Sequence, residues 1–137
     1  MEKANITADQ LNRFMGIYER NDDAELYEFV FLGDIDDVFK YRSYISSMIE
    51  KTENQIKAID FAVNTFIVMQ IGYNEGDVDE SKNELSASIK EYNEHLKKVK
   101  DLIRKRQDKC QHDWHVVGNT SHQDLERCSK CGKEIWV

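Results

Sequence analysis

Residues 85–103 read LSASIKEYNEHLKKVKDLI, and this stretch decides the fold. Its apolar side chains recur in steps of four and three residues, at Leu85, Ile89, Tyr92, Leu96, Val99 and Ile103. A mean period of about 3.5 residues is typical of a helix that packs lengthwise against another helix. The seam therefore predicts a long helix over residues 77–108, with Asp77 or Asp79 as its N-cap.

A second long helix is predicted just before this one, over about residues 35–73. Its apolar face carries Tyr41, Ile45, Met48, Ile56, Ile59, Val63 and Phe66. Residues 61–73 are apolar nearly all round, so we expect them to be the most buried part of the helix. A short turn at 74–77 would make the two helices antiparallel neighbours. A seam that dimerises is the alternative, so the chain is expected to be a monomer or a homodimer.

The first 34 residues predict short helices. Thr7 and Gln10 have capping-box spacing at the start of the first helix. Residues 21–23 and 33–34 bound a second short helix, for which an edge strand through 29–32 is the alternative. The predicted fold is thus mainly α: an antiparallel hairpin of long helices with short N-terminal helices, followed by a small C-terminal zinc ribbon with a short β-hairpin.

Composition excludes several classes of protein. The 137 residues carry a net charge of −7, which argues against a protein that simply coats nucleic acid or an anionic membrane. No apolar run reaches the roughly 18 residues of a membrane span. The N-terminal residues contain no apolar signal core, so we expect a cytoplasmic protein. Proline is absent, which favours long uninterrupted helices.

The composition changes near residue 108. Residues 1–37 hold 10 acidic and 3 basic side chains, whereas all three cysteines and both tryptophans lie in residues 109–137. We therefore predict an acidic helical domain over 1–108 and a separate zinc-ribbon-like unit over 109–137.

The C-terminal unit carries the strongest chemical signal. Cys128 and Cys131 are separated by two residues and followed by Gly132, a spacing that lets one tight turn aim both thiols at a metal ion. Zn²⁺ takes four ligands in a tetrahedron, and Cys110 is the expected third. His112 is the preferred fourth ligand, because side chains at i and i+2 of an extended segment share a face. His122 and His115 remain alternatives.

At this point residues 110–137 resemble the zinc-ribbon family, in which two ligand pairs clamp one structural metal. Cys128, Cys131 and Gly132 match the second knuckle, while Cys110 and His112 are separated by one residue where the family has two. Strands are expected at 114–117, 125–127 and 135–137, with Trp114 and Trp136 covering the metal and docking the unit on the helical body. A redox C-x-x-C pair is the other interpretation, but it usually opens a helix after a strand.

Two charged clusters have both a functional and an ordinary interpretation. A basic cluster could contact nucleic-acid phosphates or could simply be the solvated end of a helix. It comprises Lys97, Lys98, Arg104, Lys105, Arg106 and Lys109. An acidic cluster around an aromatic residue could bind a partner or could consist of helix caps. It comprises Asp22, Asp23, Glu25, Tyr27, Glu28, Asp34, Asp36 and Asp37.

The sequence contains no catalytic constellation, so we do not expect an enzyme. The leading hypothesis is a zinc-containing protein-interaction module that regulates or inhibits a partner protein. A narrower form of it is a phage-type inhibitor of a host nucleic-acid enzyme or defence system. The alternatives are a nucleic-acid-binding protein that uses the zinc ribbon and residues 97–109, and a homo-oligomeric structural subunit that assembles through the heptad seam.

Overall fold

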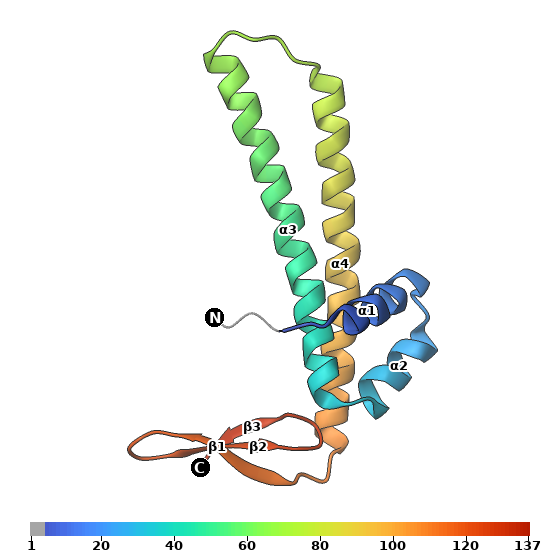
Figure 1. The fold of residues 1–137 in the computed structure, drawn as a ribbon, viewed down its shortest axis with the longest axis vertical. Coiled ribbons are helices and arrows are strands. Elements are labelled where there is room, and N and C mark those ends of the chain that lie inside the picture. Colours follow the sequence, from blue (N-terminus) through green and yellow to red (C-terminus); the bar gives the residue numbers. More distant parts are fainter. Residues whose placement is uncertain (1–4) are drawn as a thin grey trace. The chain divides into compact units, whose positions relative to one another are not determined.

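A computed structural model describes residues 5–137, which form four helices and a three-stranded antiparallel sheet (Figure 1). The helices are α1 (Ala8–Arg20), α2 (Asp23–Leu32), α3 (Ile35–Val68) and α4 (Glu75–Lys109). The strands are β1 (Trp114–Asn119), β2 (Asp124–Cys128) and β3 (Glu134–Trp136). The two long helices α3 and α4 pack together, which confirms the mainly α fold with a small C-terminal sheet.

Polar side chains fix where each helix begins. Thr7 and Gln10 form the predicted capping box of α1, with reciprocal hydrogen bonds of 3.2 and 2.9 Å. The Asp22 carboxylate caps α2, and that of Asp34 accepts from the first backbone N–H groups of α3. The predicted cap of α4 is wrong: the Asn74 side chain accepts from the N–H of Asp77, so α4 begins two residues earlier than expected.

The chain forms two compact units. One comprises the chain up to Ser43 together with Lys98–Val137, and the other is Tyr44–Lys97. The division at residue 108 predicted from composition stays a prediction. The core of the first unit contains three aromatic rings in edge-to-face contact, those of Phe14, Phe29 and Tyr41, whose centroids lie 5.3 to 6.2 Å apart. Phe29 lies on the buried face of α2, so the alternative of a strand at 29–32 is wrong.

In the Tyr44–Lys97 unit, the end of α3 and the start of α4 run side by side in opposite directions (Figure 1). Ile45 and Leu96 are buried, and an ion pair of 2.6 Å joins Lys82 to Asp60. Two expectations were wrong here. Helix α3 ends at Val68 rather than near 73, and the end of this helix is exposed instead of buried. The exposed apolar side chains, which we call the hairpin tip, are Phe61, Ile67, Val68, Met69 and Ile71.

The C-terminal sheet has the strand order β1-β2-β3. Trp114 opposes Cys128 at one end of the β1–β2 ladder, and a bulge between Val116 and Gly118 shifts the register. Leu125 on β2 opposes Trp136 on β3. The expectation that Trp136 docks the sheet is wrong, because 54 % of this residue is exposed. Other contacts hold the sheet, as described below.

Candidate metal centre

Two short segments supply the candidate ligands. The segment after α4 provides Cys110 and His112, whereas Cys128 ends β2 and Cys131 lies in the turn that follows. This turn closes through a hydrogen bond of 2.9 Å from the Gly132 N–H to the Cys128 carbonyl. Gly132 has φ +72°, a conformation that glycine adopts readily and other residues rarely do. The glycine thus allows both thiols of the knuckle to face the same point.

The four donor atoms converge in one place, all within 4.8 Å of one another. The Sγ atoms of Cys110 and Cys128 are 3.7 Å apart, and the Sγ of Cys131 lies 3.3 Å from His112 Nδ1. Two thiolates at about 2.3 Å from one tetrahedral metal ion would be about 3.8 Å apart. Cys110 and Cys128 are therefore free thiols here, because a disulfide requires about 2.05 Å between its sulfurs. The group can therefore hold a metal ion with little rearrangement.

The surroundings of the Cys128 sulfur favour its thiolate form. Burial by itself raises its pKa, but the N–H groups of Asp113 and Lys130, each 3.4 Å away, and the His112 side chain together lower the pKa to about 5. Loss of hydration and contacts with the other two thiols together raise the pKa of the Cys110 thiol to about 12. The surroundings of the pair thus favour a thiolate on Cys128 and a thiol on Cys110.

The surroundings of the four ligands are partly closed. Cys128 and Cys131 are fully buried, while Cys110 and His112 are half-buried. The indole of Trp114 lies beside the His112 ring, with centroids 4.7 Å apart. Trp114 therefore covers one side of the site, as the sequence predicts, and restricts the orientation of the imidazole.

The other two candidate histidines lie elsewhere. His122 is exposed in the turn between β1 and β2, where its backbone N–H donates to Thr120 Oγ1 at 3.4 Å. His115 is exposed on β1, with its Nε2 3.2 Å from the Asp113 carboxylate. Neither belongs to the converging group, so the geometry favours His112 as the fourth ligand.

Residues of α4 hold the knuckle against the helical part of the same unit. Arg106 donates to the Lys130 carbonyl at 2.7 Å, and Gln107 donates to the Cys131 carbonyl at 3.3 Å. A Cβ added at Gly132 would come within 2.3 Å of the Phe39 ring, which shows how closely the knuckle approaches α3. The sequence does not predict this role of Arg106 and Gln107, because spacing alone does not show which carbonyls a distant side chain reaches.

The residues of the basic cluster are not gathered into one free cationic surface. Arg106 is half-buried, and its guanidinium donates to the carbonyls of Val30 and Gly33 as well as that of Lys130. Lys98 pairs with Asp23 at 3.3 Å, and Arg104 pairs with Asp101 at 3.6 Å. Lys97, Lys105 and Lys109 are exposed, the last with its ammonium 6.0 Å from the centre of the Phe31 ring.

The acidic cluster mostly serves local structure. Asp22 and Asp34 cap helices, and Glu25 accepts from Arg20 at 2.9 and 3.2 Å. Asp37 accepts from Gln10 at 2.9 Å and lies 3.7 Å from Arg13. Glu28 and Asp36 are exposed, and so is Tyr27, whose ring stacks on that of Phe31 at 4.6 Å. These contacts support the ordinary interpretation of the acidic residues over the functional one.

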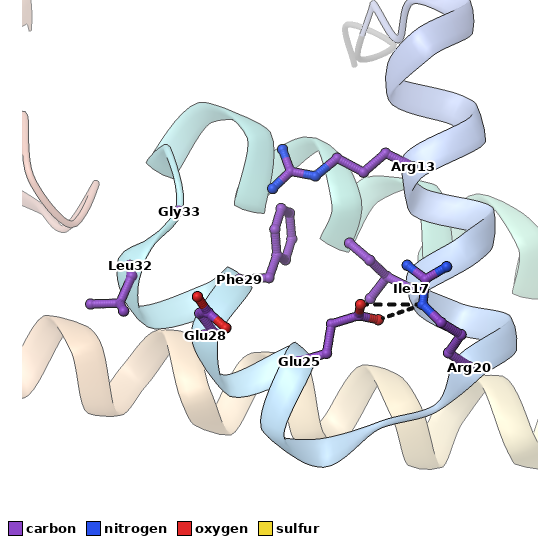
Figure 2. Close-up of a pocket in the computed structure, with 8 residues that line it drawn as sticks. All are labelled: Arg13, Ile17, Arg20, Glu25, Glu28, Phe29, Leu32 and Gly33. Atoms are coloured by element: carbon purple, nitrogen blue, oxygen red, sulfur yellow. Dashed lines mark hydrogen bonds and ion pairs between the residues drawn. The ribbon is translucent and has the colours of Figure 1, made fainter.

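A shallow depression of about 350 Å³ lies between α1 and α2 (Figure 2). Its lining residues are Arg13, Ile17, Arg20, Glu25, Glu28, Phe29, Leu32 and Gly33. Both arginines are already engaged: Arg20 by the Glu25 carboxylate, and Arg13 by Asp37 and the Phe29 ring, whose centre is 4.9 Å away. The depression therefore offers no free cation to an anionic ligand.

None of the helices within residues 5–137 combines the length and the apolar content that crossing a membrane requires. Comparisons of the chain with models of protein families, with curated proteins and with solved structures find no match. The function is therefore inferred from the candidate metal centre and from the surfaces of the chain itself.

Proposed function

We propose that the chain is a non-enzymatic protein-interaction module that regulates or inhibits a partner protein, and that one structural Zn²⁺ ion organises its C-terminal sheet. Three thiolates and one imidazole are a donor set that suits Zn²⁺, and four protein ligands would complete its tetrahedron. No coordination position would then remain for a substrate or for an activated water molecule. This closed ligand set is why we assign the metal a structural role.

The metal would contribute most of the stability of the C-terminal sheet. Residues 114–136 form three short strands, and Val116, Val117 and Trp136 on them are exposed rather than packed in a core. So small a unit usually needs a metal or disulfides to fold. The bound Zn²⁺ would therefore fix the sheet and, through Arg106 and Gln107, its attachment to α4.

The observation that carries the interaction role is the hairpin tip. Five large apolar residues within residues 61–71 are between 47 and 82 % exposed. Exposed apolar clusters with a polar rim mark protein-binding surfaces in soluble proteins. A partner that covers this surface would remove the cost of its hydration.

A tagged pull-down from bacterial lysate, with and without nuclease, tests the proposed function. We expect a stoichiometric protein partner that is retained after nuclease treatment and in moderate salt. Recovery of nucleic acid alone, or of proteins lost with nuclease, would favour the nucleic-acid alternative, since binding to phosphates weakens steeply with salt. A mass that rises with concentration and no other partner would favour the homo-oligomeric alternative.

A further inference from the structure

We propose that the hairpin tip is a docking surface for a basic amphipathic segment of the partner protein, that is, a segment with apolar side chains flanked by lysine or arginine. This inference rests on the proposed function and specifies the surface and the chemistry of the partner. All the residues that carry it belong to the Tyr44–Lys97 unit.

The apolar side chains of the tip are more exposed than the helical hairpin requires. Val68 is 82 % exposed, Phe61 75 % and Met69 62 %. They occupy the last two turns of α3 and the connection to α4, at the closed end of the hairpin (Figure 1). On the opposite side of the same turns, Val63 and Phe66 are half-buried within the hairpin. The exposed set is therefore a separate face and not the edge of the core.

Hydrogen bonds hold this face in shape. The N–H of Ile71 donates to the Phe66 carbonyl at 2.8 Å, and that of Gln70 donates to the Ile67 carbonyl at 3.2 Å. Gln70 has φ +56°, as expected for the residue that ends a helix in a Schellman motif. The Phe66 and Tyr73 rings are 6.3 Å apart across the turn. Because the backbone of the tip is already ordered, binding costs less conformational entropy there.

The rim of the tip is acidic, and this charge selects the occupant. Residues 57–82 contain five acidic and two basic side chains. One of the two bases, Lys82, forms an ion pair with Asp60. The exposed acidic residues at the start of α4 form no ion pair among the described residues. They are Glu75, Asp77, Asp79 and Glu80. An apolar segment flanked by bases complements this surface in both apolar character and charge.

The same charge argues against two other occupants. Two copies of the chain that met tip to tip would bring their acidic rims together, and like charges at close range repel. An anionic lipid surface would also repel the acidic rim. A basic amphipathic protein segment remains as the occupant that the residues fit best.

The test uses the full zinc-loaded chain and a labelled synthetic helix of leucine and lysine as the probe, read by fluorescence anisotropy. The tip variant is F61S/V68S, and its matched control is V116S/V117S, which changes two exposed apolar residues of β1. We expect the tip variant to bind the probe at least about tenfold more weakly than wild type and the control to bind it unchanged. An acid variant, D77N/D79N/E80Q, should weaken binding several-fold, and most at low salt.

Several results would overturn the inference. The first is that the tip variant and its control bind the probe equally well, and the second is that a leucine–glutamate helix binds the wild type as tightly as the leucine–lysine helix does. The third is that the wild type sediments with phosphatidylserine vesicles. The fourth is that the wild type forms a dimer that the tip variant does not form. Circular dichroism of each variant checks that the hairpin is intact. If the pull-down recovers a partner that the F61S/V68S variant retains equally, the proposed function stands and this inference fails. If it recovers no protein partner, the proposed function itself fails.

Discussion

The guanidinium of Arg106 donates to the carbonyl oxygen of Gly33 at 2.8 Å. The same side chain reaches the carbonyls of Val30 at 2.9 Å and Lys130 at 2.7 Å. The last carbonyls of a helix have no partner within the helix, and here Arg106 satisfies the Val30 carbonyl near the end of α2. One residue of α4 thus joins the end of α2 to the knuckle at residues 128–132.

Arg106→Met should destabilise the chain by about 2 kcal/mol, because carbonyls that lose a charged donor are left without a partner in a partly buried place. The matched control is Arg104→Met. Arg104 is exposed on the same helix and pairs with the exposed Asp101 at 3.6 Å, so its loss should cost less than about 0.5 kcal/mol. Urea unfolding followed by circular dichroism measures both variants. Equal stability of the two would contradict the role given to Arg106.

The sequence predicts which cysteine and histidine side chains converge better than it predicts burial along α3. Cys128, Cys131 and Gly132 are close in the chain, so one local turn brings the thiols together, and only Cys110 and His112 depend on the path of the chain between them. The capping box at Thr7 is equally local. Burial of Phe61 and Val68 depends instead on whether another element covers that turn. An apolar run predicts that these residues can be buried, but it does not show whether another element of the same chain buries them.

Gly132→Ala should destabilise the C-terminal sheet by about 1–3 kcal/mol, since it places a side chain at positive φ and against an aromatic ring. Its Cβ would meet the Phe39 ring at 2.3 Å. Gly118→Ala is the control, because the nearest atom to its Cβ, on Leu125, is 3.8 Å away. Thermal unfolding monitored by tryptophan fluorescence reports on the sheet, which contains both tryptophans. A Gly132→Ala variant as stable as Gly118→Ala would show that the knuckle moves away from α3 without cost.

His112→Ala should weaken zinc binding by at least about tenfold, whereas His122→Ala should leave it nearly unchanged. His112 Nδ1 faces the Cys131 sulfur, and His122 lies outside the converging group. Competition with a chromophoric zinc chelator gives both affinities. The reverse order would make His122 the fourth ligand.

Zinc binding should weaken as the pH falls. In the metal-free chain the pKa of the Cys128 thiol is lowered to about 5 from an ordinary 9.0. Because the pKa of this thiol is lower in the folded than in the unfolded chain, its ionisation stabilises the folded chain. This stabilisation is full above about pH 9, decreases as the pH falls, and is lost below about pH 5. Protons also compete with the metal for the Cys110 sulfur throughout this range, because the pKa of that thiol is raised to about 12. Chelator competition over this range measures the effect, and an affinity independent of pH would contradict it.

Cys131→Ser should release the metal and unfold residues 110–137, while the helical signal largely survives. The hydroxyl of serine is a poor substitute for a thiolate ligand, and without the metal the sheet has too little buried apolar area to stay folded. Cys128→Ser should behave in the same way, because it also removes a thiolate from the group of four. The Cys128 sulfur in addition accepts hydrogen bonds from the N–H groups of Asp113 and Lys130, which the substitution disturbs.

Ser129→Ala is the control for these cysteine variants. Ser129 lies between the two cysteines, and its hydroxyl bonds only weakly to Asp113, at 3.3 Å, so its loss should leave one zinc per chain. Elemental analysis gives the metal content, circular dichroism reports the helices, and tryptophan fluorescence reports the sheet. The helices should survive because the buried residues Phe14, Phe29 and Tyr41 contact one another without help from the knuckle. A Cys131→Ser chain that keeps one zinc ion would show that the four-residue site is misassigned. Loss of the helical signal together with the metal would mean that Arg106 and Gln107 make the helical part of the unit depend on the knuckle.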